Sequence, residues 1–126
     1  MAGTVTTDNE FQKTQVIYYT TIQGENPVSD FLDSLLQMQQ AKILRILQYI
    51  DKYGISSVLP HTRKLTGTPL WEIRILGKDN LRVLYVIPVK NIVLVLHGFV
   101  KKKQKTPRKE IDIAVSRLKD WQSREI

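Results

Sequence analysis

Residues 70–99 read LWEIRILGKDNLRVLYVIPVKNIVLVLHGF, and this stretch decides the fold. It holds three runs rich in β-branched and aromatic residues, near 70–76, 80–87 and 91–99, with short turn-forming segments between them. Such runs predict three consecutive strands joined by hairpins. Arg74 and Arg82 each interrupt an apolar run, and His97 stands near the end of the third. Because an arginine inside an apolar strand is costly unless it faces water or a partner, these cations are the first candidates for a functional site.

Side-chain alternation predicts the register of the first hairpin. A three-residue loop at 77–79 pairs Ile73 with Val83 on an apolar face, and it pairs Arg74 with Arg82 on the opposite face. A two-residue loop at Lys78-Asp79 would instead place Arg82 among the core residues, so we reject it.

For the second hairpin we expect a two-residue loop at Val89-Lys90, which places Arg82 opposite His97. Arg74, Arg82 and His97 would then form a row on the sheet face away from the helices, with Glu72 one step along that face. Like charges opposed across strands are destabilising, and a bound polyanion would offset that cost. The alternatives are a solvated face with Glu72 as counter-ion and a histidine with a structural role.

The flanking segments are predicted to be one further strand and three helices. Residues 15–20 form a strand, and Asn26 caps a helix that has Pro27 at its first position. Two apolar stripes of helical spacing follow, with a break near 37–40 and a stop at Gly54, which predicts a helical hairpin. After a connection at 55–69 and the three strands, a last helix begins at Pro107 with Thr106 as its cap.

The predicted fold class is therefore α+β: a small, antiparallel-dominated sheet of about four strands, an N-terminal helical hairpin and a C-terminal helix. With 126 residues the chain is long enough for one sizeable core. We expect a flexible tail at residues 1–13 and a single domain at residues 14–126.

The composition favours a polyanionic partner. The formal net charge is +7, and the sequence pI is about 9.7. There is no cysteine, so disulfides and thiolate metal sites are excluded, and no zinc pattern, P-loop or dinucleotide-binding loop is present. No apolar run could span a bilayer, and residues 1–13 lack the apolar core of a signal peptide. We expect a cytoplasmic protein with no metal, no cofactor and no membrane partner.

A block of cations follows the third strand and leads into the last helix. Helix N-termini attract anions, so the position of this block makes phosphate binding more plausible than for an isolated basic run. Two cations in the preceding connection could reach the same site. The candidate residues for contacts with RNA or the ribosome are Arg63, Lys64, Lys101, Lys103, Lys105, Arg108 and Lys109.

The order of elements, together with these cations, resembles the RelE/ParE toxin superfamily, and within it the phage-derived, HigB-like branch. The resemblance covers about residues 15–120, and no single motif carries it alone. The matching stretches are 64–67 (KLTG), 70–74 (LWEIR), 81–85 (LRVLY), 96–102 (LHGFVKK), 104–107 (QKTP), Glu110-Ile111 and Ala114.

The resemblance implies a RelE-like fold and a toxin of a type II toxin–antitoxin system that cleaves mRNA on the ribosome without a metal. It implies that Arg82 contacts phosphate, that Arg74 takes the place of a catalytic lysine, and that Lys101 or Lys102 is a second stabilising cation. His97 would take a general acid–base role. Glu72 departs from the family pattern, because the RelE branch has a lysine there. The implied catalytic set is Arg82, Arg74, His97 and Lys102.

The implied reaction is attack of a ribose 2′-hydroxyl on the adjacent phosphate, for which cations supply electrostatic stabilisation and a side chain transfers protons. The implied partners are the ribosome, mRNA and a cognate antitoxin, a helix-turn-helix protein of the HigA-like kind. Two alternatives stay open: a ParE-like toxin that inhibits DNA gyrase, and a non-catalytic nucleic-acid-binding protein.

Overall fold

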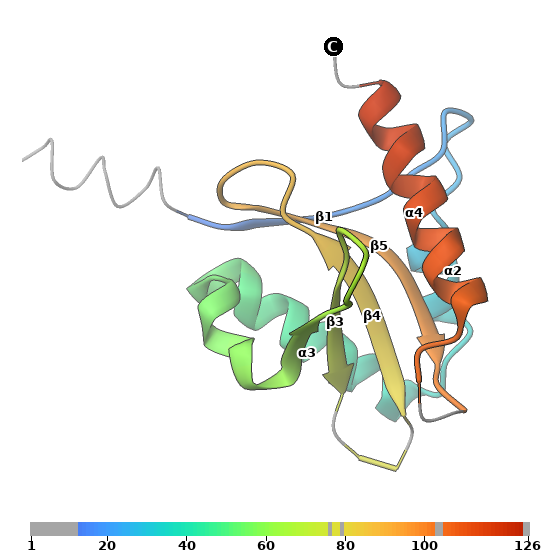
Figure 1. Cartoon of the computed structure of the whole chain (residues 1–126). Helices are drawn as coiled ribbons and strands as arrows, with labels where there is room; N and C mark the ends of the chain where they lie inside the picture. The colour runs from blue at the N-terminus through green and yellow to red at the C-terminus, as the bar shows by residue number, and fades with distance from the viewer. Residues whose placement is uncertain (1–12, 76, 79, 103–104, 125–126) are drawn as a thin grey trace, which may run out of the picture.

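The computed structural model describes residues 13–124 except 76, 79, 103 and 104 (Figure 1). Its elements are β1 (Gln15–Tyr18), α2 (Pro27–Asp33), α3 (Gln37–Tyr53), the 3-10 helix η1 (Ile55–His61), β2 (Thr62–Lys64), β3 (Trp71–Ile75), β4 (Leu81–Val86), β5 (Ile92–Val100) and α4 (Arg108–Ser123). The predicted loose tail falls on residues 1–12, which lie outside the described residues, and on Lys13. None of the helices in the described part of the chain has the length and apolar character that a membrane span requires.

The described strands form one five-stranded sheet in the order β1-β5-β4-β3-β2. β1 runs parallel to β5, and the other neighbours are antiparallel. The predicted α+β class with an antiparallel-dominated sheet is confirmed. The short edge strand β2 forms within the segment that the sequence analysis took for a plain connection.

Helices lie on both faces of the sheet (Figure 1). α2 and α3 cover one face, and α4 packs on the other through Ala114 and Leu118, which belong to a buried cluster with Leu84 and Leu96. The prediction that the arginine row lies on a sheet face away from the helices is wrong. Leu84 and Leu96 lie on that same face, and their apolar surface has to be covered.

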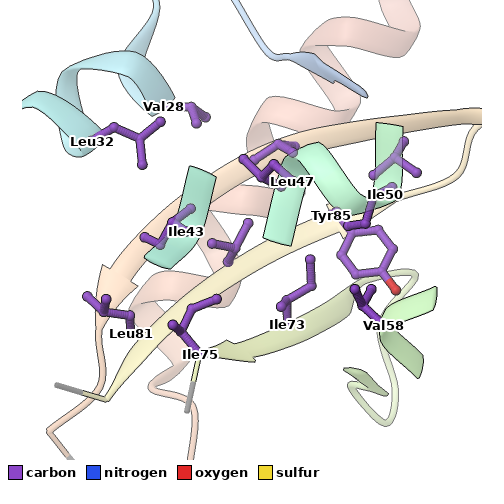
Figure 2. Packing of buried hydrophobic residues seen from close by; sticks show 13 residues of the cluster. Val28, Leu32, Ile43, Leu47, Ile50, Val58, Ile73, Ile75, Leu81 and Tyr85 are labelled. Atoms are coloured by element: carbon purple, nitrogen blue, oxygen red, sulfur yellow. The ribbon is translucent and has the colours of Figure 1, made fainter. Parts of the chain in front are cut away.

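The larger core lies between the sheet and the N-terminal helical hairpin. Figure 2 shows Ile43, Leu47 and Ile50 of α3 directed toward the strands. They form one buried cluster with Ile73 and Tyr85. These side chains repeat every three or four residues along α3, so one stripe of the helix is buried. This packing fixes which side chains of β3 and β4 face α3, and it places Glu72, Arg74 and Arg82 on the other face of the sheet, together with Leu84.

The ends of the helices partly match the predicted signals. The Asn26 side chain accepts a hydrogen bond from the Ser29 N–H at 3.0 Å, with Pro27 at the first helical position, as expected. Gly54, at φ 89°, ends α3 as predicted. The break predicted near 37–40 is misplaced, because α2 ends at Asp33 and α3 begins at Gln37. The interruption is at 34–36, where the Ser34 hydroxyl donates to the Phe31 carbonyl.

Thr106 does not cap the last helix, so that prediction is wrong. Pro107 occupies the N-cap position, and no side chain caps α4 there. The Thr106 hydroxyl donates instead to the carboxylate of Glu72, at 2.5 Å. Thr106 lies one residue before the N-cap position, where its hydroxyl oxygen would have to accept a backbone N–H of the first turn, and its side chain instead reaches the buried carboxylate.

The predicted register is confirmed for β3 and β4, where Ile73 pairs with Val83 and Arg74 pairs with Arg82. It is wrong for β4 and β5, where Arg82 pairs with Phe99 and His97 pairs with Leu84.

Two irregularities cause this shift. The turn includes Asn91 in the left-handed conformation, at φ 66°, and it is closed by the Ile92 N–H donating to the Val89 carbonyl. In addition, Leu96 is an extra residue in β5, because Tyr85 pairs with Val95 while Leu84 pairs with His97. A β-bulge of this kind moves every later residue one position along its partner.

We predict that Gly98→Ala destabilises the protein. A β-carbon at position 98 would lie 2.5 Å from the Cδ2 and Cε2 atoms of the Phe31 ring, where α2 crosses β5. The expected loss in the free energy of unfolding is about 1–3 kcal/mol, measured by urea denaturation. In a double-mutant cycle with Phe31→Leu, the double variant should lose less than the sum of the two single variants. Full additivity would contradict a steric origin.

Candidate functional site

The candidate site is centred on the carboxylate of Glu72 in β3, which has no exposed surface. Arg63 of β2 donates from Nε to Glu72 Oε1 at 3.2 Å, and Thr106 donates to Oε2. Arg63 and Glu72 are also cross-strand partners. A carboxylate is stable in such a position only when charges and donors surround it, and here both of its oxygens are engaged.

Arg82 of β4 lies beside this carboxylate, with 11% of its side chain exposed. Its Nη1 donates to the Leu81 carbonyl at 3.0 Å. Its Nε is 3.8 Å from Glu72 Oε1, and among the described residues it finds no hydrogen-bond partner. Burial lowers the pKa of Arg82; Glu72 opposes this shift, and Arg74 and Arg63 add to it. Arginine stays charged under such shifts, so the site contains a cationic guanidinium that is slightly exposed and has one buried, unpaired N–H.

Lys101 and Arg74 complete the cluster. Lys101 is 8% exposed, and its backbone N–H donates to the Asn80 carbonyl at 2.8 Å, which continues the contact between β5 and β4 past the end of the strand. Burial lowers the pKa of Lys101; Glu72 raises it, and Arg82, Arg63 and Arg74 lower it further. Arg74 is exposed and pairs across the strands with Arg82. We call Arg63, Arg74, Arg82 and Lys101, together with Glu72, the cationic cluster.

The other predicted cations lie outside this cluster. Lys64 is exposed and donates to the Thr68 carbonyl, and Arg108 forms an ion pair with Asp112 at 3.0 Å. Lys105 is also exposed. Lys103 lies outside the described residues. A cleft of about 500 Å³ beside the first turn of α4 is lined by Phe99, Val100, Lys102, Pro107, Lys109 and Glu110. Lys102, predicted to be catalytic, therefore faces solvent and this cleft, whereas its neighbour Lys101 is buried in the cluster.

His97 does not join the row in which the sequence analysis placed it. Its Nε2 is 2.6 Å from Glu110 Oε1, and its Nδ1 is 3.2 Å from Nη1 of Arg117. Because guanidinium can only donate, Nδ1 accepts, and the neutral ring donates from Nε2 to Glu110. The ring also stacks on Phe99. Both ring nitrogens are thus occupied by side chains of α4, and His97 ties that helix to the sheet.

Sequence reasoning found some of these residues and missed others. The alternation of side chains correctly placed Glu72 on the same face as Arg74. Because the RelE branch has a lysine at this position, Glu72 was treated as a departure from the pattern and not as the centre of the site. No local signal connects Thr106 with Glu72, which lies 34 residues earlier. Arg117 stands next to the buried apolar positions of α4. An arginine at such a position is a sequence signal for a partner on the sheet, and here the partner is His97. Among the described residues, no three His, Asp or Glu side chains gather as metal ligands would.

The comparisons with known proteins give one family. A family model described as "Phage derived protein Gp49-like (DUF891)" matches residues 30–119, which is more than half of the chain. The matched range contains the whole cationic cluster and most of α4. A comparison with curated proteins gave no significant match.

We predict that stability falls as the pH is lowered through the range below 6.5, and that His97 causes much of this. Burial lowers the pKa of His97; the hydrogen bond with Glu110 opposes this shift, and Arg117 adds to it. Between the lowered pKa and the ordinary value of about 6.5, the unfolded chain binds a proton that the folded protein does not. The free energy of unfolding should therefore drop by up to about 1.4 kcal/mol per pH unit in that window.

The measurement is urea denaturation between pH 7.5 and 5.5, with the His97 ring followed by NMR. In His97→Gln the pH slope should be much flatter, although the variant is less stable overall. An unchanged slope in that variant would show that other groups cause the acid sensitivity.

Proposed function

The chain belongs to the phage-derived Gp49-like family, a RelE/HigB-like toxin family, and from this premise we propose that it is the toxin of a type II toxin–antitoxin system that cleaves mRNA on the ribosome. The proposed partners are mRNA, the ribosome and a helix-turn-helix antitoxin of the HigA-like kind. The proposed site of action is the cytoplasm, where ribosomes and mRNA meet.

The observation that carries the proposal is the cationic cluster. Arg63, Arg82 and Lys101 lie around one carboxylate, and Arg74 lies opposite Arg82 on the neighbouring strand. The Nε of Arg82 has no acceptor among the described residues. An RNA phosphate supplies acceptors for this guanidinium, which is suited to bidentate binding of phosphate oxygens. The net charge of +7 favours the approach of RNA as a whole.

The proposed reaction needs no metal. The 2′-oxygen attacks the adjacent phosphorus, the bond to the 5′-oxygen breaks, and the products carry a 2′,3′-cyclic phosphate and a 5′-hydroxyl. Arg82 and Arg74 would stabilise the negative charge that grows on the phosphate oxygens, which is usually the largest electrostatic contribution. The ribosome would hold the mRNA in a reactive geometry, which a small and open site cannot do alone.

Proton transfer in this proposal falls to Lys101 rather than to His97. Both ring nitrogens of His97 are engaged by Glu110 and Arg117. Lys101 lies among the cations that would hold the phosphate, and its lowered pKa brings it closer to the range in which a lysine exchanges protons. Lys102 and Lys109, which line the cleft beside α4, would contact RNA outside the reacting phosphate.

We predict that Arg82→Ala abolishes toxicity and cleaves mRNA about 100- to 1,000-fold more slowly, because it removes a donor to the developing charge. The measurement is induced expression with mapping of mRNA 5′ ends, followed by cleavage in a cell-free translation reaction. Arg45→Ala is the matched control, since Arg45 is exposed on α3, the helix on the other side of the sheet. It should arrest growth and cut mRNA as the wild type does.

Other outcomes would replace the proposal. Growth arrest without new mRNA ends, and without loss in Arg82→Ala, would point to a gyrase-inhibiting toxin. Salt-sensitive RNA binding with neither arrest nor cleavage would indicate a non-catalytic nucleic-acid-binding protein.

We predict that substitutions of the adjacent residues Lys101 and Lys102 have very different effects on the rate of mRNA cleavage. Lys101→Met should slow cleavage by at least about 100-fold, the usual contribution of a proton-transfer group. Lys102→Met should change the single-turnover rate little, because that side chain would contact RNA away from the reacting phosphate and the ribosome already holds the mRNA. Single-turnover cleavage of ribosome-bound mRNA measures both. Equal effects of the two variants would remove Lys101 from its proposed role.

A further inference from the structure

Glu72 stands where an acid is least expected, in the middle of a site proposed to bind phosphate. An acid there could weaken the site by repelling the substrate. Its contacts argue otherwise, because Oε1 receives the Arg63 Nε–H and Oε2 receives the Thr106 hydroxyl. The carboxylate is fully buried, so water screens it little and its interactions with the adjacent cations are strong.

The balance of charge explains why the acid is needed. Arg74 and Arg82 are directly opposed across the strands, and Arg63 and Lys101 lie close to the same carboxylate. Like charges at such positions repel one another, and a buried cation without a counter-charge is costly. One carboxylate among four cations lowers this repulsion and still leaves the cluster strongly positive.

The two arginines nearest to Glu72 contact it in different ways. Arg63 is held by a direct hydrogen bond to Oε1, at 3.2 Å. Arg82 Nε is 3.8 Å from the same oxygen, near enough for electrostatic attraction but beyond hydrogen-bond length. Arg82 is therefore attracted into place by Glu72, while its buried Nε–H forms no hydrogen bond with this carboxylate.

We propose that Glu72 is a positioning residue, which holds Arg63 and Arg82 in the geometry that receives phosphate, and that the Thr106 hydroxyl fixes the orientation of its carboxylate. This inference rests on the proposed function and goes beyond it. Thr106 lies directly before α4, so the hydrogen bond also couples the segment that leads into this helix to the cationic cluster.

The test compares Glu72→Gln with Glu25→Gln, a matched change at an exposed glutamate far from the cluster in sequence. In Glu72→Gln, kcat for cleavage of ribosome-bound mRNA should fall by about 10- to 100-fold, because the cations lose their alignment. The Kd for a short single-stranded RNA should stay the same or decrease, because the net charge becomes more positive. If Glu72 merely repels phosphate, kcat should rise while Kd decreases, and that result overturns the proposal.

Two variants at position 106 keep the test valid if Glu72→Gln does not fold. Thr106→Val removes the donor and should lower kcat with little change in Kd, whereas Thr106→Ser keeps the hydroxyl and should restore kcat. Wild-type kcat in Thr106→Val would overturn the role of that hydroxyl.

A readout without activity separates this inference from the proposed function. The Nε–H signals of Arg63 and Arg82 in ¹⁵N NMR should shift, and that of Arg63 should exchange faster, in Glu72→Gln but not in Glu25→Gln. Unchanged arginine signals would overturn the positioning role even if the protein cleaves RNA. Shifted signals would support it even if the wild type cleaves nothing.

Discussion

The side chain of Glu72 has no exposed surface, and a carboxylate in such a position requires opposite charge and hydrogen-bond donors around it. β2 supplies Arg63, β4 supplies Arg82, and the segment before α4 supplies Thr106. Three parts of the chain that are distant in sequence are thus brought to one point. Glu72 is the point at which these three contacts meet.

The cluster lies where two buried layers meet. α3 packs its apolar stripe on one face of the sheet, and this fixes Ile73 and Val83 inward and Glu72, Arg74 and Arg82 toward the other face. α4 covers part of that second face with apolar side chains and leaves the region near Arg74 exposed. A sheet with both faces fully covered would have no room for a substrate, and one with an open face would not bury Glu72.

The sequence alone predicted the strand register where the side chains alternate regularly. The predicted register was wrong where a β-bulge interrupts the alternation. Arg74 opposite Arg82 follows from the period of two and from the cost of a cation in the core. The bulge at Leu96 carries no such signal, because Leu96 ends an unbroken apolar run that begins at Ile92 and either register buries the residues of this run. Likewise, no rule of spacing distinguishes Lys101 from Lys102, since only the path of the chain after β5 decides which one is buried.

This bulge has a consequence for the chemistry. It moves His97 along the sheet to the level of Leu84 and brings Phe99 opposite Arg82. His97 then meets Glu110 and Arg117 of α4, and its ring rests on Phe99. The histidine that looked like the proton-transfer group thereby becomes part of the contact that holds α4 to the sheet. A side chain whose two ring nitrogens are both engaged by a helix is poorly suited to exchange protons with another molecule, so in the proposed reaction this role is assigned to Lys101.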